Sequence, residues 1–207
     1  MKIGPKFKIA RRLGERIFPK TQTTKFTISG TAKRGGAGGG GGGRRRASSD
    51  YNLQLIEKQK ARYTYGLSEK QFSGYVNKSR HKAKGEPVTD LYRHLEGRLD
   101  NVIFRLGWAP SRAFARQMVV HGHVRVNGRK LNRPSYQTRP GDKIDIRPAS
   151  RERAAFKDLT ERLKNYQAPA WLLGTSEFQA EVKSAPSAGE AESNIDFGAV
   201  IEFYSRV

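Results

Sequence analysis

Cysteine does not occur among the 207 residues, so disulfide bonds and thiolate metal sites are excluded. The sequence also lacks an apolar run close to the roughly 20 residues of a membrane-spanning helix, and its first residues lack the apolar stretch of a signal peptide. The absence of cysteine fits a reducing compartment. We therefore expect a cytoplasmic protein without a membrane partner, a metal or a cofactor.

Acidic residues are scarce, because 19 Asp and Glu stand against 40 Lys and Arg and leave a net charge of +21. Like charges repel one another in an isolated fold, and a polyanionic partner relieves that repulsion. The excess is uneven, with +11 in residues 1–50, +12 in residues 51–150 and −2 in residues 151–207. The composition predicts that the first two-thirds of the chain face nucleic acid and that the last third faces protein or solvent.

No grouping of residues typical of a catalytic site is present. His121 and His123 could ligate a metal, but no acidic or cysteine partner lies nearby in the sequence, so phosphate-facing or exposed histidines are the favoured interpretation. Asp142 and Asp145 are expected to cap a turn and to balance charge. The glycine run at 35–43 lacks the Gly-Lys-Ser/Thr ending of a phosphate-binding loop. We therefore assign no catalytic residue and expect no enzymatic activity.

Residues 96–146 carry the clearest pattern, which predicts two short helices followed by a compact β-unit. Four apolar residues of the first helix repeat at helical spacing: Leu99, Val102, Ile103 and Leu106. Gly107 is placed to end this helix, and Ser111 is placed to cap the next one. Phe114 and Met118 lie four residues apart and are expected to face the core.

The period of the pattern changes to two after Gly122, which is typical of β-strands. Val124 and Val126 are predicted to point toward the core. Asn127 and Gly128 form the strongest short hairpin signal, because both positions of the turn need a positive φ.

A partner strand is predicted to return at Leu131, and a turn at 139–142 leads into a strand at 143–146. Ile144 and Ile146 of that strand are expected to point inward. A basic surface on a rigid support is suited to a groove or junction of phosphates. The residues predicted on the outward side are Arg112, Arg116, His121, His123, Arg125, Asn127, Arg129 and Lys130.

The segment 96–146 is similar to the RNA-binding module named after small-subunit ribosomal protein S-four, with its helix–turn–helix, VNG hairpin and PGD turn. Further segments extend the resemblance to the full-length bacterial ribosomal protein: SDYNLQLIEKQKARYTYGLSEKQF (Ser49–Phe72), LEGRLDN (Leu95–Asn101), SYQ (Ser135–Gln137), APAWL (Ala168–Leu172) and IEFYSR (Ile201–Arg206). The resemblance covers residues 1–16 and 47–207, in order and with the spacing of the family.

The resemblance implies an α+β fold. A split, mainly helical domain would hold an inserted RNA-binding module, made of a helix-turn-helix and a small antiparallel sheet, and a basic, glycine-rich arm would precede it. The expected boundaries are 1–47 for the arm, 48–92 completed by 186–207 for the helical domain, and 93–185 for the inserted S-four-type domain with an extra helix and hairpin.

Helical patterns also precede the central stretch. A helix is predicted at 48–66, with Ser49 or Asp50 as its cap and Gly66 at its end. Three residues are expected to form its apolar face: Leu53, Ile56 and Tyr63. Ser68, followed by Gln71, predicts the capped start of a second helix. The apolar residues of this helix and of a third one are Phe72, Tyr75, Val76, Leu91 and Leu95.

Three elements are predicted after the central stretch. Ser150 is expected to cap a charged helix whose apolar residues are Phe156, Leu159 and Leu163. Strands at 171–173 and 178–182 are predicted to form a hairpin that enlarges the sheet. The last helix carries an apolar stripe of Phe197, Val200, Ile201 and Tyr204. The family arrangement implies that this stripe returns to the early helices.

The basic arm contains a glycine run at 35–43, a composition typical of a flexible linker. We expect the linker to let the arginines at 44–46 bind RNA phosphates. The alternative interpretation is a disordered tether that adopts no single conformation when the protein is bound. Some family members carry a cysteine zinc site in this region, which the absence of cysteine excludes here.

The resemblance implies a structural constituent of the small ribosomal subunit. It would be a primary ribosomal-RNA-binding protein that stabilises a multi-helix junction, nucleates subunit assembly and, with neighbouring proteins, influences translational accuracy. The residues expected to bind ribosomal RNA are Arg11, Arg12, Arg44, Arg45, Arg46, Tyr51, Lys58, Lys60, Arg62, Arg98, Arg112, Arg116, His121, His123, Arg125, Asn127, Arg129, Lys130 and Tyr136.

The resemblance also implies protein partners. Gln54, Glu202 and Tyr204 are expected to contact small-subunit protein S-five, and protein S-three and messenger RNA at its channel into the ribosome are further expected neighbours. An RNA-modifying enzyme, such as a pseudouridine synthase or a methyltransferase, is the alternative, because such enzymes carry the same module. Such enzymes need a separate catalytic domain, however, and the rest of this chain already matches the ribosomal family. A third interpretation, an RNA chaperone or translational regulator, is compatible with the ribosomal one.

We expect the purified chain to bind small-subunit ribosomal RNA with a steep salt dependence, because each neutralised phosphate releases counterions. The slope of log affinity on log salt should steepen by about 0.7–0.9 for each phosphate contacted. Filter binding at a series of salt concentrations measures this slope. An affinity that does not change with salt would contradict the electrostatic interpretation.

Overall fold

The computed structural model describes residues 3–24, 26–28, 49–82, 86–153, 156, 158–164, 166–187 and 195–206. The arginines predicted to bind RNA at 44–46 lie outside the described residues. The chain divides into two compact units, one formed by Met1–Phe72 with Ile195–Val207 and the other by Ser73–Asn194. This division falls within helix α3 (Glu69–Lys82). The domain boundaries expected from the sequence stay a prediction.

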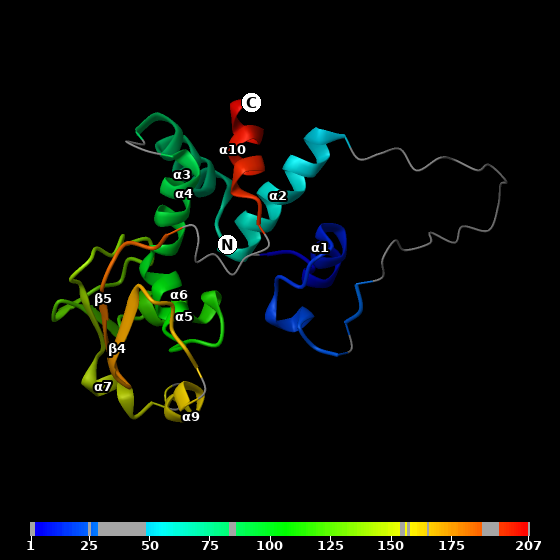
Figure 1. Cartoon of the computed structure of the whole chain (residues 1–207). Helices are drawn as coiled ribbons and strands as arrows, with labels where there is room; N and C mark the ends of the chain where they lie inside the picture. Colours follow the sequence, from blue (N-terminus) through cyan, green and yellow to red (C-terminus); the bar gives the residue numbers. More distant parts are fainter. Residues whose placement is uncertain are drawn as a thin grey trace. The chain divides into compact units, whose positions relative to one another are not determined.

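The first unit is helical (Figure 1). Its elements are α1 (Lys6–Leu13), the 3-10 turn η1 (Pro19–Thr21), α2 (Asp50–Thr64), the first turn of α3, and α10 (Phe197–Ser205). Helix α10 packs against α2, which confirms the predicted return of the last helix to an early one. Its buried residues are Phe197, Val200 and Phe203, whereas Ile201 and Tyr204 are half-buried.

The buried face of α2 differs from the predicted one. Gln54, Lys58 and Ala61 are buried, whereas Leu53 is 52% exposed. The predicted burial of Leu53 is therefore wrong. Residues at positions i, i+4 and i+7 share one face of a helix, and the aliphatic stem of Lys58 serves as apolar surface there, with its ammonium 4.8 Å from the centre of the Phe203 ring.

The N-terminal segment forms a small apolar cluster that the description of residues 1–47 as an arm did not anticipate. Ala10, Phe18 and Phe26 are buried. The residues that pack against them are Ile3, Ile9, Ile17, Ile28 and Tyr63. The Thr21 hydroxyl donates to the Phe18 carbonyl at 2.6 Å and accepts from the Phe18 N–H at 3.1 Å. This reciprocal pair stabilises the turn η1 directly after Phe18.

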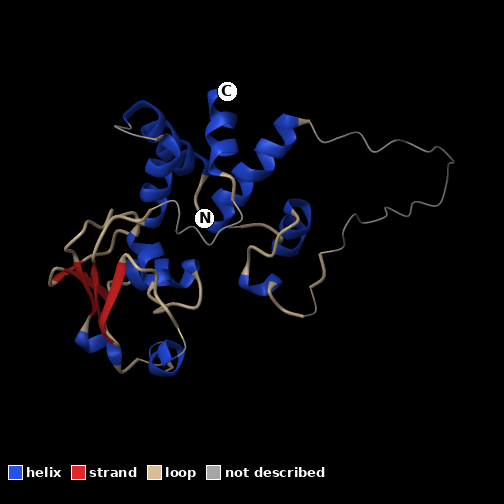
Figure 2. Cartoon of the chain, viewed as in Figure 1, coloured by secondary structure: helices blue, strands red, loops and turns tan. Residues whose placement is uncertain are grey.

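The second unit combines helices with one antiparallel sheet (Figures 1 and 2). Its helices after α3 are α4 (Pro87–Glu96), α5 (Leu99–Arg105), α6 (Arg112–Val120), α7 (Pro148–Arg151) and α9 (Leu159–Lys164). Its strands are β1 (Val124–Val126), β2 (Arg129–Lys130), β3 (Lys143–Ile146), β4 (Leu172–Ser176) and β5 (Gln179–Val182). They pair in the order β2-β1-β3-β5-β4. The α+β fold class is confirmed.

One face of the sheet and the pair α5–α6 enclose the core of the second unit. All of the predicted inward residues except Phe114 are buried: Leu99, Val102, Ile103, Leu106, Met118, Val124, Val126, Ile144 and Ile146. Phe114 packs against them while partly exposed. The Ser111 hydroxyl accepts the Phe114 N–H at 3.2 Å, which confirms the predicted cap. Asn127 and Gly128 have φ of +51° and +77°, which confirms the predicted turn.

The segment after β3 contains a correction. Ser150 does not cap a single long helix; it lies inside α7, and α9 begins separately at Leu159. Pro148 at the first helical position starts α7 early, because its fixed φ suits a helix start and its missing N–H is not needed there. The predicted hairpin is confirmed as β4–β5, which adds to the sheet through β3.

A matched pair of leucine substitutions tests the face of α2 and the first unit's interior. Leu67→Ala should lower the free energy of unfolding by about 2–5 kcal/mol, because Leu67 is fully buried. Leu53→Ala should change it by less than about 0.5 kcal/mol, because that side chain is half exposed. Urea unfolding measures both, and a loss at Leu53 as large as that at Leu67, which follows α2, would contradict the outward position of Leu53 on α2.

Candidate nucleic-acid interface

The β1–β2 hairpin and the loop after it present cations to solvent. Arg129 and Lys130 follow the left-handed turn and are exposed, as are Arg133 and Arg139 farther along the chain. In the described part of the chain, none of these four forms an ion pair. Unpaired guanidinium and ammonium groups on a rigid hairpin are suited to phosphate oxygens.

The two arginines of α6 lie against α5 and are only half-buried, so each keeps part of its surface in solvent. The Arg112 Nε donates to the Asn101 Oδ1 at 2.7 Å. Arg116 donates from Nε and Nη2 to the Asp100 Oδ2, at 2.9 and 2.8 Å. The sequence correctly places both on one face, but it did not predict the polar partners on α5.

Arg98 requires a correction, because only 2% of it is exposed. Its Nε and Nη2 donate to the Asp100 carboxylate at 3.0 and 2.8 Å, and its Nη1 donates to the Tyr75 hydroxyl at 2.8 Å. Burial alone would lower the pKa of Arg98, but the hydrogen bonds and charge of Asp100 raise it above its usual value. Arg98 is thus a buried, charged member of the fold and is removed from the candidate surface.

The two histidines predicted to meet RNA differ in their surroundings. His121 is exposed, whereas His123 is half-buried with its Nδ1 3.0 Å from the Ser150 hydroxyl. Burial lowers the pKa of His123, and the cations Arg153 and Arg147 lower it further. Sequence reasoning missed these two arginines, because only the pairing of β1 with β3 brings residues beyond Ile146 beside His123.

Asp142 stabilises the base of the hairpin. The Asn127 Nδ2 donates to the Asp142 Oδ1 at 2.8 Å, and the Arg139 N–H donates to its Oδ2 at 2.9 Å. The Tyr136 hydroxyl also lies 3.4 Å from the Asp142 Oδ2, and burial together with Asp142 raises the pKa of Tyr136. The Asn127 Oδ1 accepts the Lys143 N–H at 2.9 Å. The predicted turn-capping role of Asp142 is confirmed.

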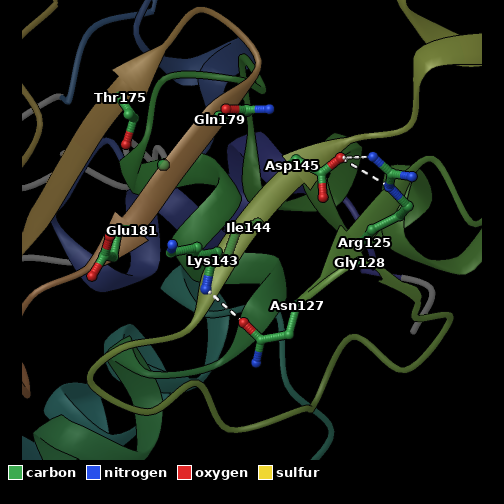
Figure 3. Close-up of a pocket in the computed structure, with 10 residues that line it drawn as sticks. Arg125, Asn127, Gly128, Lys143, Ile144, Asp145, Thr175, Gln179 and Glu181 are labelled. Atoms are coloured by element: carbon green, nitrogen blue, oxygen red, sulfur yellow. Dashed lines mark hydrogen bonds and ion pairs between the residues drawn. The ribbon is translucent and has the colours of Figure 1, made fainter.

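The face of the sheet opposite the core contains a hollow of about 330 Å³ (Figure 3). Its lining includes Arg125 and Lys143 together with Asp145 and Glu181. The Arg125 Nε donates to the Asp145 Oδ2 at 2.8 Å, which confirms the predicted charge balance at Asp145. Because cations and acids share the lining, the hollow is less suited to phosphate than the hairpin.

Where the structure describes them, the cations predicted on the first unit fall into two groups. Arg11 and Arg12 are exposed in the last turn of α1. The others bind acids: Lys58 and Arg62 pair with Glu69, and Lys60 pairs with Glu57 and Glu15. Lys58 is only 8% exposed, so burial removes it from the candidate surface. The ring of Tyr51 is half exposed and lies 5.4 Å from the ring of Phe203.

The residues predicted to contact a partner protein lie on or beside α10. The Tyr204 hydroxyl donates to the Glu69 Oε1 at 2.6 Å, and burial together with this bond raises the pKa of Tyr204. Gln54 is 6% exposed, so this chain itself covers most of its side chain. Glu202 is exposed and pairs with Arg206 one helical turn away.

Comparison with known proteins covers both units. Residues 1–96 match the ribosomal protein S4/S9 N-terminal domain, and residues 97–144 match the S4 domain. The chain is 48% identical to small ribosomal subunit protein uS4 of Roseiflexus castenholzii over 207 residues, covering 99% of this chain and 98% of that one. The chain belongs to the uS4 family. Identity to uS4 of Chloroflexus aurantiacus is 43%, over 99% and 98% of the two chains.

The exposed cations of the β1–β2 hairpin and of the loop after it lie within the S4 domain match. The S4 domain match contains α5, α6 and the β1–β2 hairpin, and it ends within β3. The strands β4 and β5 and the helix α9 lie beyond it. Within the described ranges, no helix is long and apolar enough to span a membrane, and no group of three or more potential metal-ligating side chains occurs.

The Glu69 cluster should make stability depend on pH. Burial alone would raise the pKa of Glu69, but the hydrogen bonds from Lys58 and Tyr204 hold it below its ordinary value of 4.5. Its contribution is therefore complete above pH 4.5 and is lost as pH falls through the lowered pKa. Glu69→Gln should modestly lower the free energy of unfolding at pH 7, and the difference from the natural chain should vanish in stronger acid.

Urea unfolding between pH 3 and 7 checks this expectation. Glu161→Gln, at an exposed glutamate of α9, is the matched control and should leave the pH profile unchanged. The effect of Glu69→Gln is expected to be modest because 45% of that side chain is exposed and solvent screens the interaction. A constant difference at every pH would contradict the assigned role of the carboxylate.

Proposed function

We propose that this uS4-family chain is a structural constituent of the small ribosomal subunit that binds ribosomal RNA directly. The observation that carries the proposal is the exposed, unpaired set of cations on the β1–β2 hairpin and the loop after it, within an S4 domain. The relatives named small ribosomal subunit protein uS4 match over nearly the whole chain, which supports the same assignment.

The mechanism is passive binding by charge and shape. Paired RNA hides its base edges in a deep, narrow groove, so a protein reads its phosphates and its shape. Arginine provides planar, bidentate contacts to phosphate, and a stiff hairpin orders few side chains on binding. Arg129, Lys130 and the half-exposed Arg112 and Arg116 are suited to this role. No chemical step is involved.

Each unit has its own proposed RNA-binding residues. In the second unit they are Arg112, Arg116, His121, His123, Arg129, Lys130, Arg133, Arg139, Arg147 and Arg153, with Arg125, Asn127 and Tyr136 shaping the hairpin base. In the first unit they are Arg11, Arg12, Tyr51, Lys60 and Arg62. The arginines at 44–46 belong to the proposal from sequence alone.

The finer role follows the family resemblance. We propose early binding to a multi-helix junction of the ribosomal RNA, which nucleates subunit assembly, and a division into an arm at 1–47, a helical domain at 48–92 with 186–207, and an inserted domain at 93–185. Neighbouring proteins S-five and S-three and incoming messenger RNA are the proposed partners through which the protein influences accuracy. Glu202 is the most accessible of the residues proposed for the S-five contact.

A pair of hairpin substitutions tests the RNA-binding role. Arg129→Gln with Lys130→Gln should weaken binding to small-subunit ribosomal RNA about tenfold or more, because both exposed cations are lost. The slope of log affinity on log salt should also become shallower by about 1 for each lost phosphate contact. Filter binding measures both quantities, and circular dichroism verifies that the fold is retained.

The matched control removes two charges elsewhere. Lys164→Gln with Lys183→Gln changes two exposed lysines in the acidic last third of the chain, so a much smaller loss of affinity is expected. Equal losses of affinity in the two double variants would mean that the hairpin cations contribute only nonspecific electrostatic attraction. Failure of the natural chain to co-sediment with small subunits would overturn the proposed function itself.

A further inference from the structure

Asp100 is a buried carboxylate shared by two arginines. It lies in the first turn of α5, and 4% of its side chain is exposed. Its Oδ2 accepts a hydrogen bond from Arg98 at 2.8 Å and two from Arg116, at 2.9 and 2.8 Å. Arg98 is buried, whereas 27% of the Arg116 side chain is exposed. The carboxylate therefore connects the interior to the surface of α6.

The position of Asp100 is itself fixed by the backbone. The Asp100 N–H donates to the Pro134 carbonyl at 3.2 Å, and the preceding Leu99 N–H donates to the Tyr136 carbonyl at 2.9 Å. Arg98 holds the other carboxylate oxygen through its Nε at 3.0 Å. Because both carboxylate oxygens of Asp100 are bound and its backbone is held by hydrogen bonds, Asp100 can bind the Arg116 guanidinium in only one orientation.

We infer that Asp100 is a positioning residue for RNA binding, which it serves by holding Arg116 in one orientation at the surface. The inference rests on the proposed function, because it assumes that Arg116 meets RNA. Asp100 itself is too buried to touch a phosphate, and its charge would repel one. An unrestrained arginine loses rotamer freedom when it binds, and a side chain that is already held loses less.

The sign of the expected effect separates positioning from net charge. Asp100→Asn raises the net charge of the chain by one, and extra positive charge alone strengthens binding to a polyanion. Loss of the carboxylate that holds Arg116 weakens binding instead. The two interpretations therefore predict opposite changes in affinity for the same substitution.

A double-mutant cycle with the full chain tests the inference. The natural chain, Asp100→Asn, Arg116→Gln and the double variant are compared in binding to small-subunit ribosomal RNA. Asp100→Asn is expected to weaken binding about tenfold, which corresponds to about 1.4 kcal/mol. The double variant should bind as weakly as Arg116→Gln alone, because Asp100 acts only through Arg116. Additive losses, or tighter binding by Asp100→Asn, would overturn the inference.

Asp90→Asn is the matched control, since it makes the same charge change on α4 of the same unit. Asp90 forms an exposed pair with Arg93 at 3.4 Å, away from α6 in sequence and without contact to the proposed RNA-binding residues. The Asp90→Asn variant should bind the RNA as tightly as the natural chain or slightly more tightly. If the natural chain does not bind the RNA, the proposed function fails. If it binds but the double-mutant cycle shows no coupling between Asp100 and Arg116, only the present inference fails.

Asp100→Asn leaves Arg98 buried without its charged partner, which can prevent folding. In that case the variant Arg116→Lys tests the inference instead. Lysine keeps the charge but lacks the planar fork that binds the Asp100 Oδ2 twice. The inference predicts that Arg116→Lys loses most of the affinity that Arg116→Gln loses, with an unchanged circular dichroism signal. Binding like that of the natural chain would overturn it.

Discussion

The pairing of buried carboxylates with arginines inside the second unit is the interaction on which the candidate surface depends. Asp100 binds Arg98 and Arg116, and Glu96 binds Arg105 through both of its oxygens, at 2.9 and 3.0 Å. Removing one partner of a buried pair leaves a charge without compensation, which is strongly destabilising. Asp100 therefore joins α6 to α5, and Glu96 joins the end of α4 to α5, so that α6 carries Arg112 and Arg116 on a fixed support.

The backbone before α5 explains why this arrangement is so tightly set. The Thr138 N–H donates to the Gly97 carbonyl at 2.8 Å, and the Gln137 side chain donates to the His94 carbonyl at 3.0 Å. A Cβ at Gly97 would lie 2.8 Å from the Arg93 carbonyl oxygen in the preceding turn of α4 and 3.3 Å from the Gln137 Oε1, so this crowded position requires glycine. The loop that precedes β3 is thereby tied to Gly97, which lies between Glu96 at the end of α4 and Asp100 in the first turn of α5.

The large positive charge is divided by the fold into two classes of cation. One class, which includes Arg98, Arg105 and Lys58, binds acids inside the units and stabilises them. The other, which includes Arg129 and Lys130, lies exposed on a hairpin with no acid within 4 Å in the described part of the chain. A net charge of +21 thus reflects both a structural use of arginine and a surface that a polyanion would neutralise.

Sequence alone determined the features that depend on neighbouring residues: the Asn127–Gly128 turn, the Ser111 cap and the alternating burial of Val124 and Val126. These follow from local φ preferences and from the periods of helix and strand. Only the tertiary structure decided that Arg98 is buried, that Leu53 faces outward and that Arg147 lies beside His123. Composition and spacing mark a side chain as charged or apolar, but its partner comes from a distant segment, and a charge is buried or exposed according to whether that segment supplies an opposite one.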